Sequence, residues 1–294
     1  MSEMLKKRTS GEKDRTEKYL EAYPDVFADI TNVLIVGKSV VQPKDLKDGP
    51  TESVYKAEHQ DGLREQRRDI AKYVERAGVG IILIGLENQS TVDCDMVFRV
   101  MGYDYASYRG QIDAGKHRFP VITGILYYGD RPWRAPCTIG EAVKVPEEYQ
   151  EMFSDYRIHV IDVPRLPEEV REKLTSDFRV VADYFAGRKN EDYVPIDQPL
   201  KHPEAMLEFL RVFAGDERYE QIEEEIAEQS RKGEPVRMCE VLDRAERRGI
   251  EQGIDSILQL MNLMEQGGDG DRVLLLQKDP KFLKEMCDKY NIKI

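Results

Sequence analysis

Two acidic side chains stand at positions in the sequence where carboxylates could work together. Asp69 opens a segment with the alternation of a β-strand, and Glu87 follows the apolar run VGIILIGL at residues 79–86. If these segments pair as a hairpin around residues 76–78, both carboxylates lie at the same end of the sheet. Two carboxylates at one place can hold a hard divalent ion such as Mg²⁺, with a backbone carbonyl completing part of the shell. Asp69 and Glu87 are therefore candidate metal ligands.

Gln89 lies two residues after Glu87, so an extended strand places both side chains on the same face. A polar group there is able to orient a water molecule beside the metal. The alternative interpretations are that Asp69 is a turn former and that Glu87 is a solvated residue. Asp14 or Glu17 on the first predicted helix could add a carboxylate, unless they belong to its solvated face.

The elements that must position these residues have the order helix, strand, strand, strand, helix and strand, which is typical of an α/β unit. Their predicted ranges are 12–31, 33–36, 68–74, 79–86, 95–114 and 120–128, with an exposed loop at 42–62 and a last strand at 157–163. Helical periodicity then predicts helices at 167–187, 203–232, 236–266 and 280–290, with a linker at 267–270. We therefore predict an α/β domain at residues 1–165 and an acidic helical region at residues 166–294.

The charge distribution permits a nucleic-acid partner without indicating one. A net charge of -12 argues at first against DNA, because phosphates must be met by Lys and Arg. The whole acidic excess lies in residues 135–294, whereas residues 64–134 carry a net charge of +2. A solvated surface also explains this balance.

The remaining composition excludes several classes of protein. No apolar run approaches the roughly 18 residues of a transmembrane helix, and the basic N-terminus lacks the apolar stretch of a secretory signal. No C-x-x-C pair occurs among the four cysteines, which are Cys94, Cys137, Cys239 and Cys287. A disulfide framework and a zinc knuckle are therefore not expected. We expect a cytoplasmic protein with no membrane partner.

The sequence pattern of Asp69, a gap and then Glu87-x-Gln89 at a strand end resembles the motif of the PD-(D/E)XK nuclease superfamily. In that superfamily, the residue at the position of Gln89 is usually Lys. One branch is similar over longer phrases, RRDIAKYVERAGVGIILIGLENQSTVDCDMVFRVMGYDYASYRGQI and FPVITGILYYGDRPWRAP. This branch is the Rpn family of recombination-promoting nucleases and transposases. The resemblance continues through SDYRIHVIDV, SDFRVVADYF and MCEVLDRAERRGIEQG, and covers about residues 12–260.

The resemblance implies a restriction-endonuclease-like αβββαβ core with a mixed sheet and a C-terminal helical extension. It implies a Mg²⁺-dependent DNA endonuclease, with Mn²⁺ able to substitute, that hydrolyses phosphodiester bonds in recombination or in mobile elements. Asp69, Glu87 and the Asn88 carbonyl would then bind the metal, and Gln89 would take the Lys position. Lys brings a positive charge that Gln lacks. A catalytically inactive DNA-binding protein or protein-interaction module of the same fold is therefore the alternative.

The predicted DNA contacts lie on the helix after this motif and are Arg99, Tyr103, Arg109 and Gln111. Arg99 and Tyr103 are four residues apart and share a helix face, so they could meet a phosphate together. Pairing of Arg99 with Asp95 or Asp104 is the alternative. We interpret the acidic residues 93–95 as the N-terminal cap of this helix rather than as a second metal site.

An apolar face is also predicted near the C-terminus, on Leu260, Met261, Leu263 and Met264. In a chain end without a sheet of its own, such a face favours contact with a partner or self-association. The C-terminal helices are therefore the predicted site of homo-oligomer formation.

Overall fold

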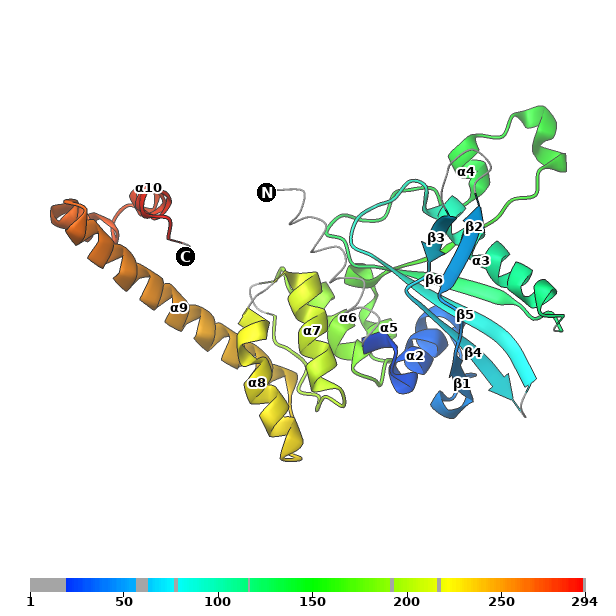
Figure 1. Ribbon diagram of the computed structural model, residues 1–294, viewed down its shortest axis with the longest axis horizontal. Helices are drawn as coiled ribbons and strands as arrows, with labels where there is room; N and C mark the ends of the chain where they lie inside the picture. Colours follow the sequence, from blue (N-terminus) through cyan, green and yellow to red (C-terminus); the bar gives the residue numbers. More distant parts are fainter. Residues whose placement is uncertain are drawn as a thin grey trace.

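A mixed five-stranded sheet forms the centre of the α/β fold (Figure 1). The computed structural model describes residues 20–56, 63–76, 79–115, 117–190, 193–215 and 218–292. In spatial order the strands are β1 (Leu46–Asp48), β4 (Ile70–Arg76), β5 (Val79–Gln89), β6 (Val121–Tyr127) and β7 (His159–Asp162). β4 is antiparallel to β1 and β5, whereas β6 is parallel to β5 and β7. The predicted α/β class with a mixed sheet is confirmed.

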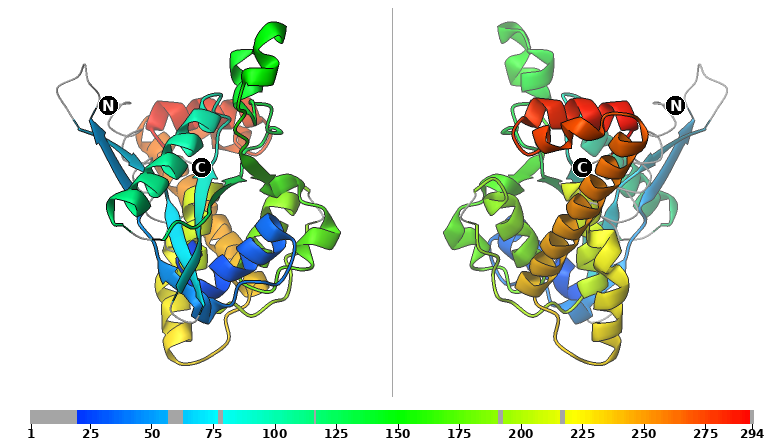
Figure 2. Two further views of the ribbon diagram at one scale, coloured as in Figure 1. Left: turned by 90° about the vertical axis from the view of Figure 1, so that its right-hand side faces the viewer. Right: turned by 90° about the vertical axis from the view of Figure 1, so that its left-hand side faces the viewer.

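Helices cover both faces of this sheet, and Figure 2 shows α2 (Pro24–Ile30) and α3 (Met96–Asp113) on opposite sides. Side chains of β5 alternate between the two faces. Ile84 and Leu86 join the cluster that contains α2, whereas Leu83 packs with Val121 on the other face. Burial on both faces explains why the sequence of β5 is almost continuously apolar. The predicted strand and the helix that follows it are confirmed.

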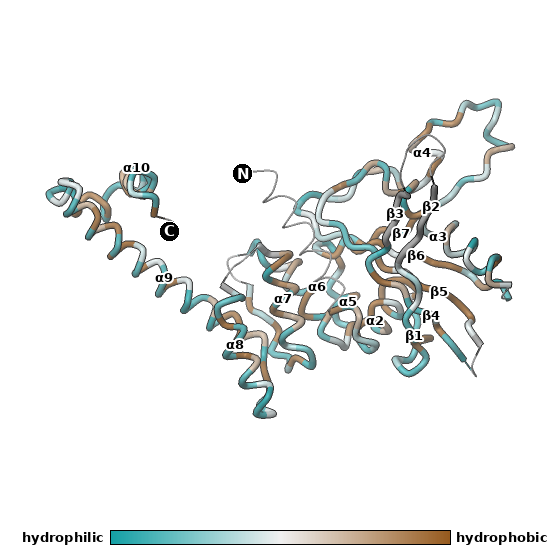
Figure 3. Tube along the Cα trace, in the orientation of Figure 1, coloured by the Kyte–Doolittle hydropathy of each residue, from teal (hydrophilic) through white to brown (hydrophobic). Residues whose placement is uncertain are grey.

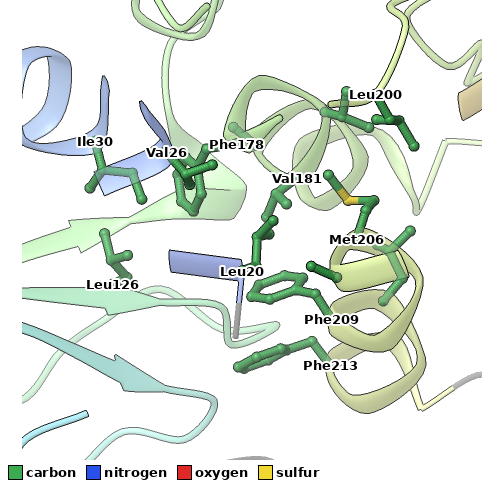
Figure 4. Close-up of a cluster of buried hydrophobic side chains, with 14 of the residues drawn as sticks. Leu20, Val26, Ile30, Leu126, Phe178, Val181, Leu200, Met206, Phe209 and Phe213 are labelled. Carbon is green, nitrogen blue, oxygen red and sulfur yellow. The ribbon is translucent and has the colours of Figure 1, made fainter. Parts of the chain in front are cut away.

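One large hydrophobic cluster joins the sheet to the helices of the C-terminal half. It combines α2 and the sheet with α6 (Phe178–Gly187), α7 (Pro203–Ala214) and α8 (Arg218–Arg231). Figure 4 shows Leu126 of β6 and Phe209 and Phe213 of α7 in this cluster. The cluster contains residues from both sides of the predicted domain boundary at residue 166. The division into two domains therefore stays a prediction. The short α4 (Ile139–Val143) and α5 (Glu168–Arg171) lie in the connecting segments.

The 29-residue helix α9 (Met238–Gln266) extends away from the sheet, and α10 (Pro280–Tyr290) packs at its far end (Figure 1). A separate cluster joins Leu260 and Met264 of α9 to Phe282 and Met286 of α10. The face predicted at residues 260–264 is thus covered in part by the chain itself. Within the described part of the chain, no helix has the length and apolar character required to cross a membrane.

The strand predicted at residues 33–36 is wrong. α2 continues instead as a π-helix, Thr31–Val36, that ends at Gly37 with φ 71°. The apolar, β-branched run favours a strand by local propensity, but Val33, Leu34 and Ile35 pack as helical residues against the main cluster. Tertiary packing therefore overrides the local preference.

The predicted loop at residues 42–62 is wrong in part, because it contains β1 and β2 (Glu52–Lys56). β2 pairs with β3 (Leu63–Arg67), and the pairs β1·β4 and β2·β3 form two halves of one long hairpin. A bend at residues 68–69 separates the halves, where the Arg68 amide donates to the Thr51 carbonyl. The two strands were missed because their sequences are polar and show no alternation of apolar residues.

Candidate functional site

Asp69 and Glu87 lie level with each other on neighbouring strands. The register of β4 and β5 pairs Ile70 with Leu86, so the next position places Asp69 opposite Glu87 on the same face. Asp69 occupies the bend just ahead of β4, and its Oδ2 accepts a 2.7 Å hydrogen bond from the Asn88 amide. The expected hairpin pairing is therefore present, but Glu87 lies inside β5 rather than after its end.

The Glu87 carboxylate is buried, and one of its oxygens is crowded with donors. Oε1 accepts from Arg99 Nη2 at 2.7 Å and from the Tyr103 hydroxyl at 3.4 Å. The Gln89 Nε2 donates to the same oxygen at 3.4 Å, so Gln89 shares the face of Glu87. Burial and the charge of Asp69 raise the pKa of Glu87 to about 8, although Arg99 opposes this shift. The group is thus poised between its protonated and charged forms near neutral pH.

The other oxygen of Glu87 fits a metal ligand. Oε2 is buried and has no hydrogen-bond partner among the described residues. A strand residue directs its N–H and C=O to the same edge, so the Asn88 carbonyl points to the side of Asp69 as its amide does. No group of three or more His, Cys, Asp or Glu in the described ranges could hold a metal ion. Mg²⁺ commonly needs only one or two carboxylates beside water and phosphate, so this donor set fits such an ion.

A third carboxylate, Glu21, lies across the sheet and was missed from the sequence. It is a fully buried helical residue ahead of α2, and its Oε2 accepts a 2.9 Å hydrogen bond from Asn88 Nδ2. Tyr128 donates to its Oε1 at 3.3 Å. Burial, and to a smaller extent the Asp69 charge, raise the pKa of Glu21 to about 8. The residues predicted to add a carboxylate, at positions 14 and 17, lie outside the described residues.

A buried arginine next to Asp69 was also missed. Arg68 Nη2 donates to Asp104 Oδ1 at 3.0 Å, and the Tyr156 and Thr123 hydroxyls donate to the same carboxylate at 2.7 and 2.6 Å. Arg68 Nε and Nη1 are buried without hydrogen-bond partners in the described part of the structure. Room for this side chain exists because residue 85 is Gly, since a Cβ there would lie 2.3 Å from Arg68 Cδ. The positive charge contributes to the field at Glu87.

Arg99 links the site to the start of α3. Its Nη1 donates to Asp93 Oδ2 at 2.9 Å while Nη2 donates to Glu87, and the side chain is 38% exposed. Arg99 therefore pairs with Glu87 and Asp93, whereas the alternative left by the sequence was a pair with Asp95 or Asp104. Asp95 takes the N-cap position of α3 as predicted, but its side chain makes no capping hydrogen bond.

The other predicted DNA contacts are spread along α3. Tyr103 is buried beside Glu87, whereas Arg109 is exposed and forms an ion pair with Asp113 at 3.1 Å. Gln111 is buried, and both its amide atoms bind the main chain of Phe119. This placement gives Gln111 a structural role and does not favour the predicted contact with DNA.

Comparison with protein families matches residues 54–184 to the family described as "Putative transposase, YhgA-like". Over this segment, the chain is similar to the YhgA-like transposase family. The family is part of the Rpn-like PD-(D/E)XK group, so the resemblance inferred from the sequence is confirmed. No solved structure matches the chain.

The segment matched to the YhgA-like transposases begins inside β2 and ends inside α6. It contains Asp69, Glu87, Gln89 and Arg99, so the clustered carboxylates and their neighbours all belong to the family region. Glu21 and the helices α7 to α10 lie outside the matched residues.

Proposed function

We propose that this YhgA-like transposase relative is a metal-dependent DNA endonuclease that acts in recombination or in mobile elements. The observation that carries the proposal is the unsatisfied Oε2 of Glu87, buried level with Asp69 at one end of β4 and β5. A buried acceptor without a donor costs free energy unless a ligand satisfies it. A divalent cation is the ligand that suits two adjacent carboxylates.

Under this proposal, Asp69, Glu87 and the Asn88 carbonyl hold Mg²⁺, and Mn²⁺ substitutes for it. When bound, the ion supplies Lewis-acid polarisation of a phosphate oxygen. When only the strands of the five-stranded sheet are counted, and β2 and β3 are left out, the element order is α2, β1, β4, β5, α3 and β6. This is the αβββαβ order of the PD-(D/E)XK core, and it supports the same assignment.

The neighbouring side chains supply positioning and charge. Gln89 has its amide beside Glu87, where it can orient water or a phosphate oxygen by hydrogen bonding. Arg99 brings the positive charge that Gln89 lacks, and its partial exposure allows it to meet a DNA phosphate. Tyr103 fixes the position of Arg99 through a 3.2 Å hydrogen bond between Nη2 and the hydroxyl.

Cleavage of supercoiled plasmid tests the proposal. Wild-type protein should nick plasmid in Mg²⁺ or Mn²⁺ but not in EDTA, and Asp69→Asn and Glu87→Gln should each reduce the rate at least about 10²-fold. These substitutions keep shape and hydrogen bonding, so the fold should remain. Glu148→Gln, a change at an exposed residue of another segment, is the matched control. Equal cleavage by all variants would place the activity elsewhere.

A second candidate is DNA binding without hydrolysis, favoured by Gln89 at the position that is usually Lys. Binding of duplex DNA in Ca²⁺, measured by fluorescence anisotropy, separates this candidate from a protein-interaction module. DNA binding without cleavage in Mg²⁺ or Mn²⁺ would support it. A protein that neither binds nor cleaves DNA would support the protein-interaction module.

A further inference from the structure

Arg68 is a buried charge beside the candidate site, and metal binding by the carboxylates does not explain its presence. Its side chain lies directly over Gly85, which is two residues before Glu87 on the same face of β5. At the rise of a β-strand, two residues separate the two groups by roughly 7 Å along β5. The Arg68 guanidinium also contacts Asp104 of α3, so it lies between that helix and the sheet. Figure 3 shows that β5 and β6 are predominantly hydrophobic.

The contacts of this guanidinium leave part of it unsatisfied. An arginine stays protonated in proteins, so Arg68 is a permanent positive charge. Its Nη2 donates to Asp104 Oδ1 at 3.0 Å and to Ser107 Oγ at 3.4 Å. Its Nε and Nη1 are buried and have no hydrogen-bond partner among the described residues. Unsatisfied buried donors destabilise a fold, and apolar side chains often replace a buried ion pair without loss of stability. Stability therefore does not explain why an arginine occupies this position.

Asp104 does not remove the effect of this charge on the candidate site. Its carboxylate also accepts hydrogen bonds from the hydroxyls of Thr123 and Tyr156, at 2.6 and 2.7 Å. Three side chains thus share the negative charge of Asp104. Burial raises the pKa of Glu87, and the positive charge of Arg68 is one of the effects that oppose this rise. The field of Arg68 therefore reaches the Glu87 carboxylate.

Arg68 differs from Arg99 in the kind of charge that it brings. Arg99 is partly exposed and, under the proposed function, meets a DNA phosphate. The Arg68 side chain is only 3% exposed, and Gly85 and Asp104 hold it in place. It therefore cannot contact DNA, but its charge stays fixed beside the carboxylates whatever Arg99 does.

We propose that Arg68 is a positioning residue that gives the site a fixed positive charge, in place of the Lys that is usual at the position of Gln89. The inference rests on the proposed nuclease function and names no contact between Arg68 and the metal or the substrate. Negative charge develops on the phosphate as water attacks it, and a preorganised positive charge in a buried place stabilises that state. The same charge repels a divalent cation. Arg68 should therefore speed cleavage while it weakens metal binding.

The opposite signs of these two effects make the test specific. Arg68→Met removes the charge and keeps an unbranched side chain over Gly85. Its kcat for plasmid cleavage should fall about 10–100-fold, because a charge that stabilises the transition state is lost. Its KM for DNA should change by less than about threefold, because Arg68 does not contact the substrate. Its Kd for Mn²⁺, measured by calorimetry, should decrease by about 3–10-fold as the repulsion is lost. Arg68→Lys keeps the charge and should restore both values most of the way to wild type.

A second comparison guards against loss of the fold. Arg68→Met leaves the buried Asp104 without its cation, so the double variant Arg68→Met/Asp104→Asn is compared with Asp104→Asn alone. The difference between these two variants should show the same fall in kcat and the same gain in Mn²⁺ affinity. Arg171→Met is the matched control, because it removes an ion pair with Asp183 that is also largely buried but lies outside the site. Circular dichroism checks that each variant retains its helical content.

The outcomes separate this inference from the nuclease proposal. A fall of both kcat and Mn²⁺ affinity in Arg68→Met and in the double variant would show a structural role and overturn the inference. Unchanged kcat and Kd would overturn it as well. A wild-type protein that binds Mn²⁺ without cleaving DNA would contradict the nuclease proposal alone, and tighter Mn²⁺ binding by Arg68→Met would still support the fixed charge at the metal site. A wild-type protein that does not bind Mn²⁺ would overturn both.

Discussion

The protonation state of the Glu87 carboxyl is set by opposing effects of its surroundings, and it determines how Glu87 can bind a metal. Burial and Asp69 favour its protonated form, whereas Arg99, at 2.7 Å, favours the carboxylate. The net result is a pKa of about 8. A metal ion binds the carboxylate, so below this pH it must displace a proton.

We therefore expect metal affinity to rise with pH. Between pH 6 and pH 8 the apparent affinity for Mn²⁺ should increase by up to about tenfold per pH unit, and then level off. Isothermal titration calorimetry in buffers of different ionisation enthalpy measures both the affinity and the proton released. Glu87→Gln should remove most of the binding. An affinity that is independent of pH over this range would contradict the assignment of Glu87 as a ligand that starts protonated.

Glu21 gives a second pH-dependent prediction, for stability. Its pKa is raised from 4.5 to about 8, so the folded protein keeps a proton that the unfolded chain has lost above pH 4.5. Stability therefore falls as pH rises from about 4.5 to about 8. Glu21→Gln should be more stable than wild type at pH 8 by on the order of 1–3 kcal/mol, with a smaller difference at pH 5. Urea unfolding at both pH values checks this, with Glu148→Gln as control. A variant less stable than wild type at pH 8 would show that the carboxylate is needed for the fold.

The candidate site depends on close packing between β5 and the bend that precedes β4. Arg68 lies against Gly85, and its guanidinium is fixed by Asp104. A side chain at residue 85 would meet Arg68 Cδ at 2.3 Å and Nε at 2.7 Å. The Arg68 side chain is buried, so it has little freedom to move away.

Gly85→Ala should therefore destabilise the protein by about 1–3 kcal/mol, the usual cost of overpacking. It should also reduce metal binding, because displacement of Arg68 disturbs the adjacent Asp69. Gly80→Ala is the matched control in the same strand, since its Cβ would meet only Phe119 at 3.6 Å. Thermal unfolding and Mn²⁺ titration measure the two effects. Equal stability of the two variants would mean that Arg68 repacks without cost.

The secondary-structure elements that sequence could predict are those with a strong repeating pattern. β5 is a continuous apolar run and α3 has buried residues at helical spacing, and both were found with nearly correct bounds. β1 has only three residues and a polar sequence, so nothing local distinguishes it from a loop. The run at residues 33–36 has strand propensity, but packing against the main cluster makes it helical.

The same reasoning separates the site residues that could be predicted from those that could not. Asp69 and Glu87 stand out because they are acidic residues at the ends of the segments predicted as strands, and their proximity follows from a simple hairpin. Glu21 and Arg68 join the site only through the packing of a helix and through the space left by a glycine. Neither feature has a sequence signal without the three-dimensional structure.

At the scale of the whole molecule, one cluster ties the sheet to the C-terminal helices. Phe209 of α7 is fully buried and contacts the rings of Tyr128, Phe185 and Phe213. Tyr128 follows β6 and donates to Glu21, so the C-terminal helices support the back of the candidate site. We therefore expect the two predicted domains to unfold together.

Phe209→Ala tests this coupling. The loss of a buried aromatic ring should cost about 3–5 kcal/mol. Trp133, the single tryptophan, packs on Tyr127 on the other side of the sheet and reports unfolding of the α/β part. Its fluorescence midpoint in urea should fall together with the loss of helical circular dichroism. An unchanged Trp133 midpoint would instead support separate domains divided near residue 166.

The most direct test of the central claim is a crystal structure of the protein grown with Mn²⁺, with the metal located by its anomalous scattering. We expect one ion bound by Asp69 and Glu87 carboxylate oxygens at about 2.0–2.5 Å, with the Asn88 carbonyl in the same shell. The unsatisfied Glu87 Oε2 should be one of the ligands. An ion bound elsewhere, with Glu87 still bonded only to Arg99, Tyr103 and Gln89, would contradict the assignment of this site as a metal-dependent nuclease centre.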